Sequence, residues 1–272
     1  MTVPDTELVD LGTRQVEIRQ AGAGAVLFLL HGIGSTSRAW IHQFPAFRDS
    51  LRVIAWNAPG YGQSSDIDRA VPIAQDYAGV LLRVFDALEI DRAVLCGNSL
   101  GALFSGAFAR LAPDRVLGLF LSDAAQGHAR LPEEKRLANL SARLELLETK
   151  GMARMAKERS GTLLSTNARG SLKETVAGIT AEIEPVAYRK AAHALSTGDL
   201  IGDLAGYDGP MTVVCGADDR VTPPDSNRAI AASRPQASFT LIDGAGHLPY
   251  IETPESFNIL LTDFIDTLLV GG

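Results

Sequence analysis

Short apolar runs alternate with longer amphipathic segments along most of the chain. Each run has the length of a β-strand, and each longer segment repeats its apolar side chains at the spacing of a helix face. We expect strands at residues 25–30, 52–56, 93–96, 116–121, 211–215 and 238–242. Alternation of this kind predicts an α/β fold with a mostly parallel sheet that is covered by helices on both faces.

Three segments predict helices that cover this sheet. Residues 73–88 and 257–269 carry apolar side chains at helical spacing, and a helix rich in small residues is expected from about 100 to 111. The aromatic side chains in these stripes are expected to lie in the core.

The alternation breaks once, between residues 124 and 205. No strand pattern occurs there, and helical spacing is found at residues 137–147, 152–159, 171–183 and 185–196. A helical insertion between two core strands favours a cap over the carboxyl edge of the sheet. We therefore expect a core formed by residues 1–123 and 206–272, and a helical cap at residues 124–205 that selects the substrate.

Composition narrows the classes of function. The 272 residues carry 25 Lys and Arg against 32 Asp and Glu, which gives a formal charge of −7 with no basic run. This balance argues against nucleic acid as a partner. The longest apolar stretch, residues 25–30, is far too short to span a membrane. The amino terminus lacks the basic start and apolar stretch of a secretory signal, so we expect a cytoplasmic protein without a membrane partner.

The cysteines and the other metal-binding residue types give no sign of a cofactor. Cys96 and Cys215 each lie within a strand-like run and are expected to be reduced core thiols. No cluster of His, Cys and carboxylate residues has ligand spacing, so we expect neither a metal nor a cofactor. The expected partner is a small-molecule substrate, and a homo-oligomer is possible.

The pentapeptide at residues 97–101 is the strongest chemical signal. It reads Gly-Asn-Ser-Leu-Gly, between the strand at 93–96 and a helical pattern. Glycines two before and two after Ser99 permit a sharp turn that exposes the serine hydroxyl above the sheet. A structural alternative is that Ser99 merely caps the helix.

A serine hydroxyl needs a base and an orienting acid to become a nucleophile. Among the five histidines, His247 has the best position, directly after the last strand. Asp219 follows the strand at 211–215 and is the favoured acid, with Asp218 and Asp123 as alternatives. The resulting chain order, Ser99, Asp219, His247, is that of the α/β-hydrolases.

An oxyanion hole requires two backbone N–H donors near the nucleophile. We expect one from Leu100, which follows the serine, and the other from Ile33 in the loop after the strand at 25–30. His31 starts that loop and is expected to brace it by hydrogen bonding.

Five motifs together resemble the α/β-hydrolase superfamily and span nearly the whole chain outside the cap. In chain order they are His31-Gly32-x-Gly34, Asn57-x-Pro59-Gly60-x-Gly62-x-Ser64, Gly97-x-Ser99-x-Gly101, Gly216-x-x-Asp219-x-Val221-x-Pro223 and Gly246-His247-x-Pro249. The resemblance implies an eight-stranded sheet whose first two strands lie near residues 7–11 and 15–20. Asn57 departs from the pattern, because the family usually has Asp there.

In the superfamily, dehalogenases and epoxide hydrolases have an aspartate nucleophile in the turn that corresponds to residues 97–101. Ser99 in this position therefore disfavours both kinds of chemistry. A nucleotide-dependent oxidoreductase is disfavoured because no complete Gly-x-Gly-x-x-Gly opens a helix. Size and cap resemble 3-oxoadipate enol-lactonases and small carboxylesterases. We therefore expect a serine hydrolase that cleaves a small ester or enol-lactone through an acyl-enzyme on Ser99. The alternatives are a C–C bond hydrolase that acts on a ring-cleavage product of the 2-hydroxymuconic semialdehyde type, and a non-catalytic ligand-binding member of the fold.

The predicted cap contains a single aromatic residue, Tyr188, so its share of the pocket is expected to be mainly aliphatic. The expected substrate-binding residues are Leu146, Leu147, Met152, Met155, Leu163, Leu164 and Tyr188. Arg130, Arg154 and Arg189 are considered as contacts for an acidic substrate group, although solvation of these side chains is favoured.

Overall fold

An eight-stranded sheet forms the centre of the computed structural model, which describes residues 3–269. The strand order is β1-β2-β4-β3-β5-β6-β7-β8, and only the pairings of β2 with β1 and β4 are antiparallel. The strands are β1 (Thr6–Asp10), β2 (Gln15–Ala21), β3 (Val26–Leu30), β4 (Arg52–Trp56), β5 (Ala93–Asn98), β6 (Val116–Ser122), β7 (Met211–Gly216) and β8 (Ser238–Ile242). This confirms the predicted α/β fold, and each predicted strand is found within about two residues of its expected bounds.

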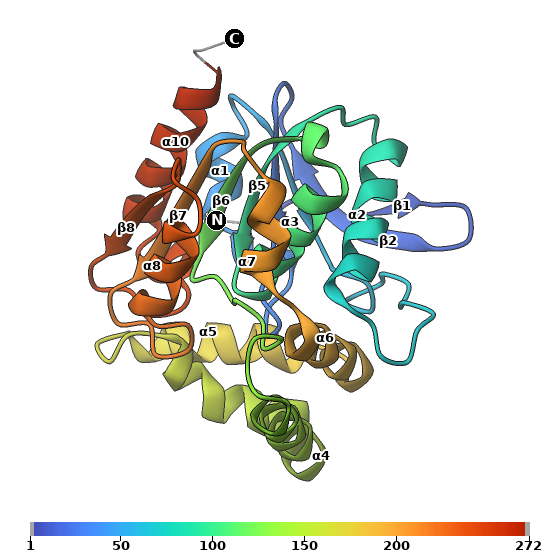
Figure 1. The fold of residues 1–272 in the computed structure, drawn as a ribbon, viewed down its shortest axis with the longest axis vertical. Coiled ribbons are helices and arrows are strands. Elements are labelled where there is room, and N and C mark those ends of the chain that lie inside the picture. The colour runs from blue at the N-terminus through green and yellow to red at the C-terminus, as the bar shows by residue number, and fades with distance from the viewer. Residues whose placement is uncertain (1–2, 270–272) are drawn as a thin grey trace.

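Helices pack on both faces of the sheet (Figure 1). The helices are α1 (Gln43–Phe47), α2 (Ala74–Ala87), α3 (Leu100–Leu111), α4 (Glu133–Leu163), α5 (Gly170–Ala181), α6 (Pro185–Thr197), α7 (Leu200–Asp203), α8 (Pro224–Ala232), α9 (Pro249–Glu252) and α10 (Pro254–Leu269). Side chains along a strand alternate between the faces. In β3, Phe28 and Leu30 join a core with α2 and α3, whereas Leu27 and Leu29 join a second core with α1 and α10.

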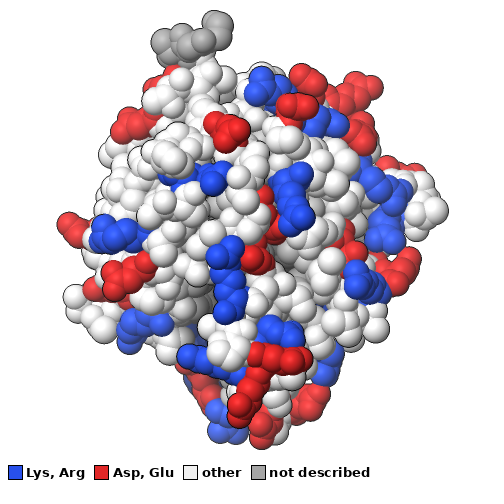
Figure 2. All heavy atoms as spheres, in the orientation of Figure 1, with Lys and Arg blue, Asp and Glu red and all other residues white. Residues whose placement is uncertain are grey.

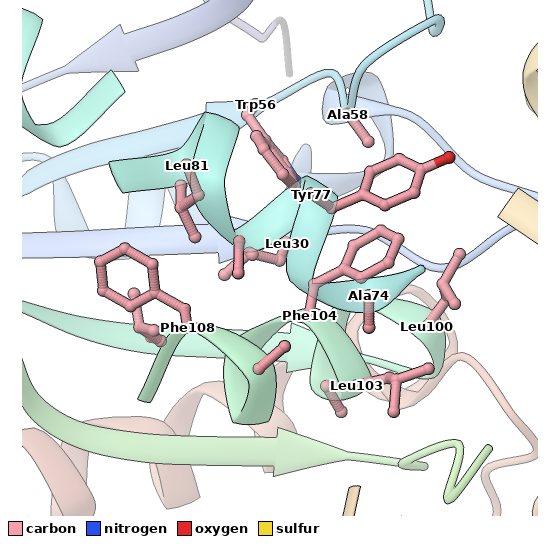
Figure 3. Packing of buried hydrophobic residues seen from close by; sticks show 14 of the residues in the cluster. Leu30, Trp56, Ala58, Ala74, Tyr77, Leu81, Leu100, Leu103, Phe104 and Phe108 are labelled. Carbon is pink, nitrogen blue, oxygen red and sulfur yellow. The ribbon is translucent and has the colours of Figure 1, made fainter. Parts of the chain in front are cut away.

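Aromatic packing fixes α2 against α3 on the first of these faces (Figure 3). The Tyr77 and Phe104 rings stack with centroids 4.2 Å apart, and Trp56 meets Phe104 edge to face at 6.3 Å. Offset stacks and edge-to-face pairs are the favoured arrangements of aromatic rings. Helix α3, which begins directly after Ser99, is thereby held rigidly on the sheet.

The inserted helices α4, α5 and α6 lie together at the carboxyl edge of the sheet, at the bottom of Figure 1. Gly151 has φ 68° and ψ 168° and interrupts α4, so the helical runs predicted at residues 137–147 and 152–159 lie on either side of a kink. Helix α7, at the end of the predicted cap, packs against α3 of the core. The division of the chain into a core and a cap remains a prediction.

Within residues 3–269 no helix has the length and apolar character needed to cross a membrane. On the face shown in Figure 2, acidic and basic side chains are interspersed.

Candidate active site

Ser99 lies in a strained turn between β5 and α3. Its φ of 54° and ψ of −113° are unusual for a residue with a side chain, and such strain is typical of functional positions. The flanking glycines are needed because the chain segments almost touch. A Cβ on Gly97 would lie 2.6 Å from the Gly101 carbonyl, and one on Gly101 would lie 2.0 Å from the carbonyl oxygen of Leu30.

The structure brings Asp219 and His247 together. Asp219 follows β7, His247 follows β8, and the imidazole Nδ1 lies 2.9 Å from Asp219 Oδ2. The remaining acceptor positions of the carboxylate are filled by the Thr222 hydroxyl at 2.7 Å and by the amides of Val221 and Thr222 at 2.7 and 3.1 Å. Burial alone would raise the pKa of Asp219, but the imidazole and these hydrogen bonds hold the pKa below its ordinary value. The carboxylate is therefore ionised and fixed in direction.

The two alternative acids lie in different surroundings. Asp218 is exposed. Asp123 is fully buried after β6, where its carboxyl accepts from the Gly216 amide at 2.9 Å and from the Ser122 hydroxyl at 2.6 Å. Among the residues that the structure describes, only Asp219 forms a side-chain ion pair with His247.

Ser99 and His247 line the same cavity, and their loops are joined by a hydrogen bond. The Asn98 amide, next to the serine, donates to the backbone carbonyl of His247 at 3.1 Å. Since Nδ1 of the imidazole faces Asp219, Nε2 lies on the other side of the ring. Over residues 3–269 no hydrogen bond of the Ser99 hydroxyl is found.

The loop after β3 is braced by His31. Its Nδ1 lies 2.8 Å from the carbonyl of Gly32, and its Nε2 accepts from the Ala58 amide at 3.0 Å. Burial lowers the pKa of His31 to about 4, so the ring is neutral and is already occupied on both nitrogens. Ile33 follows and lines the cavity. Within the described chain neither the Ile33 amide nor the Leu100 amide has a protein acceptor, so both donors are available.

The Asn57 side chain both donates and accepts a hydrogen bond, which a carboxylate cannot do. Its Nδ2 donates to the buried Glu17 carboxylate at 2.8 Å, while its Oδ1 accepts from the Ser37 amide at 2.7 Å. An aspartate would place a second negative charge against Glu17. Asn57, which stands where the family usually has Asp, is therefore part of a hydrogen-bond network outside the cavity.

The end of α4 is bonded to the loop that carries His247. The backbone amide of His247 donates to the Leu163 carbonyl at 2.8 Å. Glu252 accepts from the Gly246 amide at 2.8 Å and from the Ser165 amide at 3.0 Å, and it also bonds the Ser165 hydroxyl. We call this set of contacts the latch. Glu252 and Asn98 were not predicted from the sequence as functional, although Asn98 lies within the motif at residues 97–101 and Glu252 lies just after the motif at residues 246–249.

A cavity of about 240 Å³ opens above the carboxyl edge of the sheet. Its floor comes from loops after several strands and its roof from the inserted helices, which is the usual place for a ligand in an open α/β sheet. The lining includes Ile33, Ser99, Ala124, His128, Val221 and His247 from the loops, and Arg143, Met155, Arg159, Leu163, Val176, Ile179, Tyr188 and Leu195 from the inserted segment.

Three of the predicted substrate-binding residues line this cavity, namely Met155, Leu163 and Tyr188. The other four lie behind its wall: Leu146, Leu147 and Met152 pack in the core shared with α2 and α3, and Leu164 packs in the core on the opposite face. Helical periodicity shows that such residues are buried, but not which neighbour they face.

The three arginines that were considered as contacts for an acidic group do not line the cavity, in agreement with the favoured expectation that they are solvated. Arg130, Arg154 and Arg189 pair at the surface with Asp199, Glu158 and Glu148. Arg143 and Arg159, which the sequence analysis did not consider, line it instead. The polar pattern of α4 carries no signal that separates these two from the surface arginines.

One group of residues in the described part of the chain has ligand atoms close enough for a metal. These atoms, on Asp123, Cys215 and Asp219, lie within 4.8 Å of one another. Burial raises the pKa of Asp123 and of Cys215, so both groups are protonated, which opposes metal binding. Cys96 and Cys215 are buried and free, as expected.

Comparisons with known proteins agree with this architecture. The profile of the alpha/beta hydrolase fold family matches residues 25–254. The 2-hydroxy-6-oxononadienedioate/2-hydroxy-6-oxononatrienedioate hydrolase of Paraburkholderia phymatum is 31% identical over 272 aligned positions, which cover 92% of this chain and 91% of that protein. The 3-oxoadipate enol-lactonase 1 of Acinetobacter baylyi is 24% identical, with 94% of each chain covered.

A solved structure extends the likeness to three dimensions. A thermophilic esterase from Thermogutta terrifontis superposes with a TM-score of 0.86 at 24% identity, covering 97% of this chain and 99% of the esterase. At this level of identity the match speaks for the fold alone. The profile match covers most of the chain, and the elbow, the sheet order and the loop positions agree with it. The chain belongs to the α/β-hydrolase fold family.

Proposed function

We propose that the protein is a serine hydrolase that cleaves a small carboxylic ester or enol-lactone through an acyl-enzyme on Ser99. The contact between His247 Nδ1 and Asp219, beside a cavity that Ser99 also lines, is the observation that carries this proposal. A base oriented by an ionised acid, at a cavity that a serine also lines, is the arrangement that nucleophilic acyl transfer requires.

In the proposed reaction, His247 Nε2 takes the proton of the Ser99 hydroxyl as its oxygen attacks the carbonyl carbon. Asp219 holds the imidazole and stabilises its positive charge. The amides of Leu100 and Ile33 donate to the developing oxyanion. Collapse of the tetrahedral intermediate expels the alcohol or enol, which receives its proton from His247. Water then attacks the acyl-enzyme by the same steps and releases the acid. The proposal requires Ser99 and Nε2 to approach within hydrogen-bond distance once substrate is bound, a tightening that catalytic contacts commonly show.

Cleavage of a C–C bond in a ring-cleavage product is the second candidate. Its support is that relatives 27% and 31% identical to this chain are hydrolases of 2-hydroxy-6-oxononadienedioate. A panel of esters, enol-lactones and ring-cleavage dienones separates the two candidates by which class has the highest kcat/KM.

Ser99→Ala tests the nucleophile. We expect the variant to lose at least about 1000-fold in kcat on an activated ester, because the substitution removes the proposed nucleophile. A serine-directed phosphonate should label Ser99 of the wild type and should block release of the chromogenic product. The matched control is Ser141→Ala, at an exposed position of α4. Retained turnover in folded Ser99→Ala, checked by circular dichroism, contradicts the assignment, and a wild type that binds but hydrolyses nothing favours a non-catalytic member of the fold.

A further inference from the structure

Two guanidinium groups from α4 face the cavity without a carboxylate to neutralise them. Arg143 and Arg159 both line it, and neither forms an ion pair anywhere in residues 3–269. The surface arginines of the inserted helices differ, because Arg154 and Arg189 each pair with a glutamate. A half-buried cation without a counter-ion is unfavourable, so this wall of the cavity is suited to receive an anion.

Arg143 is held by a buried neighbour, and both arginines keep their charge. Arg143 donates to the hydroxyl of Tyr188 at 2.8 Å, and the Tyr188 side chain is buried. Burial lowers the pKa of Arg159; Tyr188 opposes this effect and Arg143 reinforces it. A guanidinium nevertheless stays protonated in proteins. Both charges are therefore present in the cavity.

A third polar group at the cavity lacks a partner. His128 lies in the segment after β6 and also lines the cavity. Its Nδ1 is buried, and within the described residues it has no hydrogen-bond partner. Buried polar atoms are nearly always satisfied, so an unsatisfied one in a cavity lined by two arginines without ion pairs indicates a place for a ligand oxygen.

We propose that Arg143 and Arg159 bind an ionised carboxylate of the substrate, so that the natural substrate is an anionic ester or lactone. This inference rests on the proposed function and adds the substrate class to it. A guanidinium matches the planar carboxylate with two parallel N–H donors, which a neutral substrate end cannot use. The lining also includes the apolar side chains of Met155, Leu163, Val176, Ile179 and Leu195. An aliphatic chain that joins the scissile carbonyl to a terminal carboxylate suits a cavity with both kinds of surface.

The test compares two esters that differ only at the far end of the acyl chain. The mono-para-nitrophenyl ester of adipate carries a terminal carboxylate, and para-nitrophenyl hexanoate carries a methyl group in its place. We expect the wild type to prefer the adipate ester by about 10-fold or more in kcat/KM. In Arg159→Gln and in Arg143→Gln this value should fall by about 10- to 100-fold for the adipate ester, mainly through KM, because charge-assisted hydrogen bonds to the carboxylate are lost.

The neutral ester and a matched arginine supply the controls. In both variants the hexanoate ester should lose markedly less kcat/KM than the adipate ester, and circular dichroism checks that both variants fold. Arg154→Gln removes an exposed arginine from the same helix and should alter neither ester. Equal losses on the two esters, or a wild type without preference for the charged one, overturn the inference while leaving the serine hydrolase proposal intact.

A wild type that cleaves neither ester refutes the proposed function for this substrate pair. The carboxylate site at Arg143 and Arg159 is then tested by the binding of free adipate. Free adipate titrated into the wild type by calorimetry should bind, and Arg159→Gln should weaken that binding by a similar factor. Absence of binding to the wild type, or equal binding to both proteins, overturns the inference.

Discussion

Two buried carboxyl groups lie side by side behind the cavity, and their surroundings give them different charges at neutral pH. Asp219 receives hydrogen bonds and faces an imidazole, which hold its pKa below the ordinary value despite burial. Asp123 is buried without a cation, and both burial and the neighbouring Asp219 charge raise its pKa well above the ordinary value. Environments that separate two pKa values in this way assign distinct roles to chemically identical groups. Asp123 is then a neutral neighbour, and Asp219 is the ionised partner of His247.

Replacement of Asp123 by asparagine should change how stability depends on pH. Folded wild type keeps a proton on Asp123 at pH values where the unfolded chain has lost it. The free energy of unfolding should therefore fall as pH rises above about 4, by up to about 1.4 kcal/mol per unit from this group, until its folded pKa is reached. Asparagine carries no such proton, so Asp123→Asn should gain stability relative to the wild type across that window. Urea unfolding between pH 5 and 8, at about one-unit steps, measures the difference.

Asp218→Asn is the matched control, because Asp218 is an exposed carboxylate in the same region. Its effect on the free energy of unfolding should stay within about 0.5 kcal/mol. The lowered pKa of Asp219 has the opposite effect on the pH dependence of stability. The stability that this group contributes is lost only as the pH falls below the ordinary pKa of an aspartate. A difference between Asp123→Asn and the wild type that does not vary with pH would contradict the protonated state of Asp123.

At the scale of elements, the latch joins the end of α4 to the loop between β8 and α9. Glu252 contributes most of it, with three hydrogen bonds from Gly246 and Ser165. Arg220, next to Asp219, adds hydrogen bonds to the carbonyls of Gly161 and Leu164. Both loops that carry the proposed acid and base are therefore anchored to the same end of an inserted helix.

Removal of the latch carboxylate should weaken both stability and turnover. In Glu252→Ala the amides of Gly246 and Ser165 lose their acceptor, so we expect a loss of about 2–4 kcal/mol in the free energy of unfolding. Turnover of an activated ester should also fall, by about 10-fold, because the support of the His247 loop is lost. Glu255→Ala, an exposed glutamate at the start of α10, should do neither. Denaturant unfolding and ester kinetics on the same samples check both expectations, and an unchanged urea midpoint in Glu252→Ala would show that the latch is not a stabilising contact.

Sequence patterns locate the elements well because each element carries its own signal. Strand β3 is buried along its whole length and reads as an unbroken apolar run. Asp219 and His247 could be predicted to meet, and Ser99 to lie at the same edge, because they follow strands β7, β8 and β5, whose carboxyl ends share one edge of the sheet. Arg143 and Arg159 could not be predicted, because the kink at Gly151 sets which sides of α4 face the cavity. The same limit applies to Leu146, Leu147, Met152 and Leu164, which are apolar as expected but lie outside the cavity wall.

At the scale of the whole molecule, the inserted helices share their hydrophobic cores with the sheet. Leu147, Met155 and Tyr188 belong to the core that contains Phe28 and Phe104. Leu163 and Ile179 belong to the core on the other face. Neither core can be exposed without loosening the sheet, so the inserted helices and the sheet are energetically coupled.

We therefore expect unfolding in a single cooperative transition. Helical circular dichroism reports heavily on α4, α5 and α6, whereas fluorescence reports on Trp40 and Trp56, which are fully buried in the sheet region. The two signals should give the same midpoint in urea within experimental error. Loss of ellipticity before the change in fluorescence would instead indicate that the inserted helices unfold on their own.

The backbone amide of His247 is bonded to the carbonyl of Leu163, so the segment that lines the cavity also supports the residue proposed to move the proton. A chimera that borrows this segment from another family member must therefore keep the junction at residues 163–165, whatever else it replaces. Divergence toward new ligands is easier upstream of that junction, where side chains can change without moving the histidine.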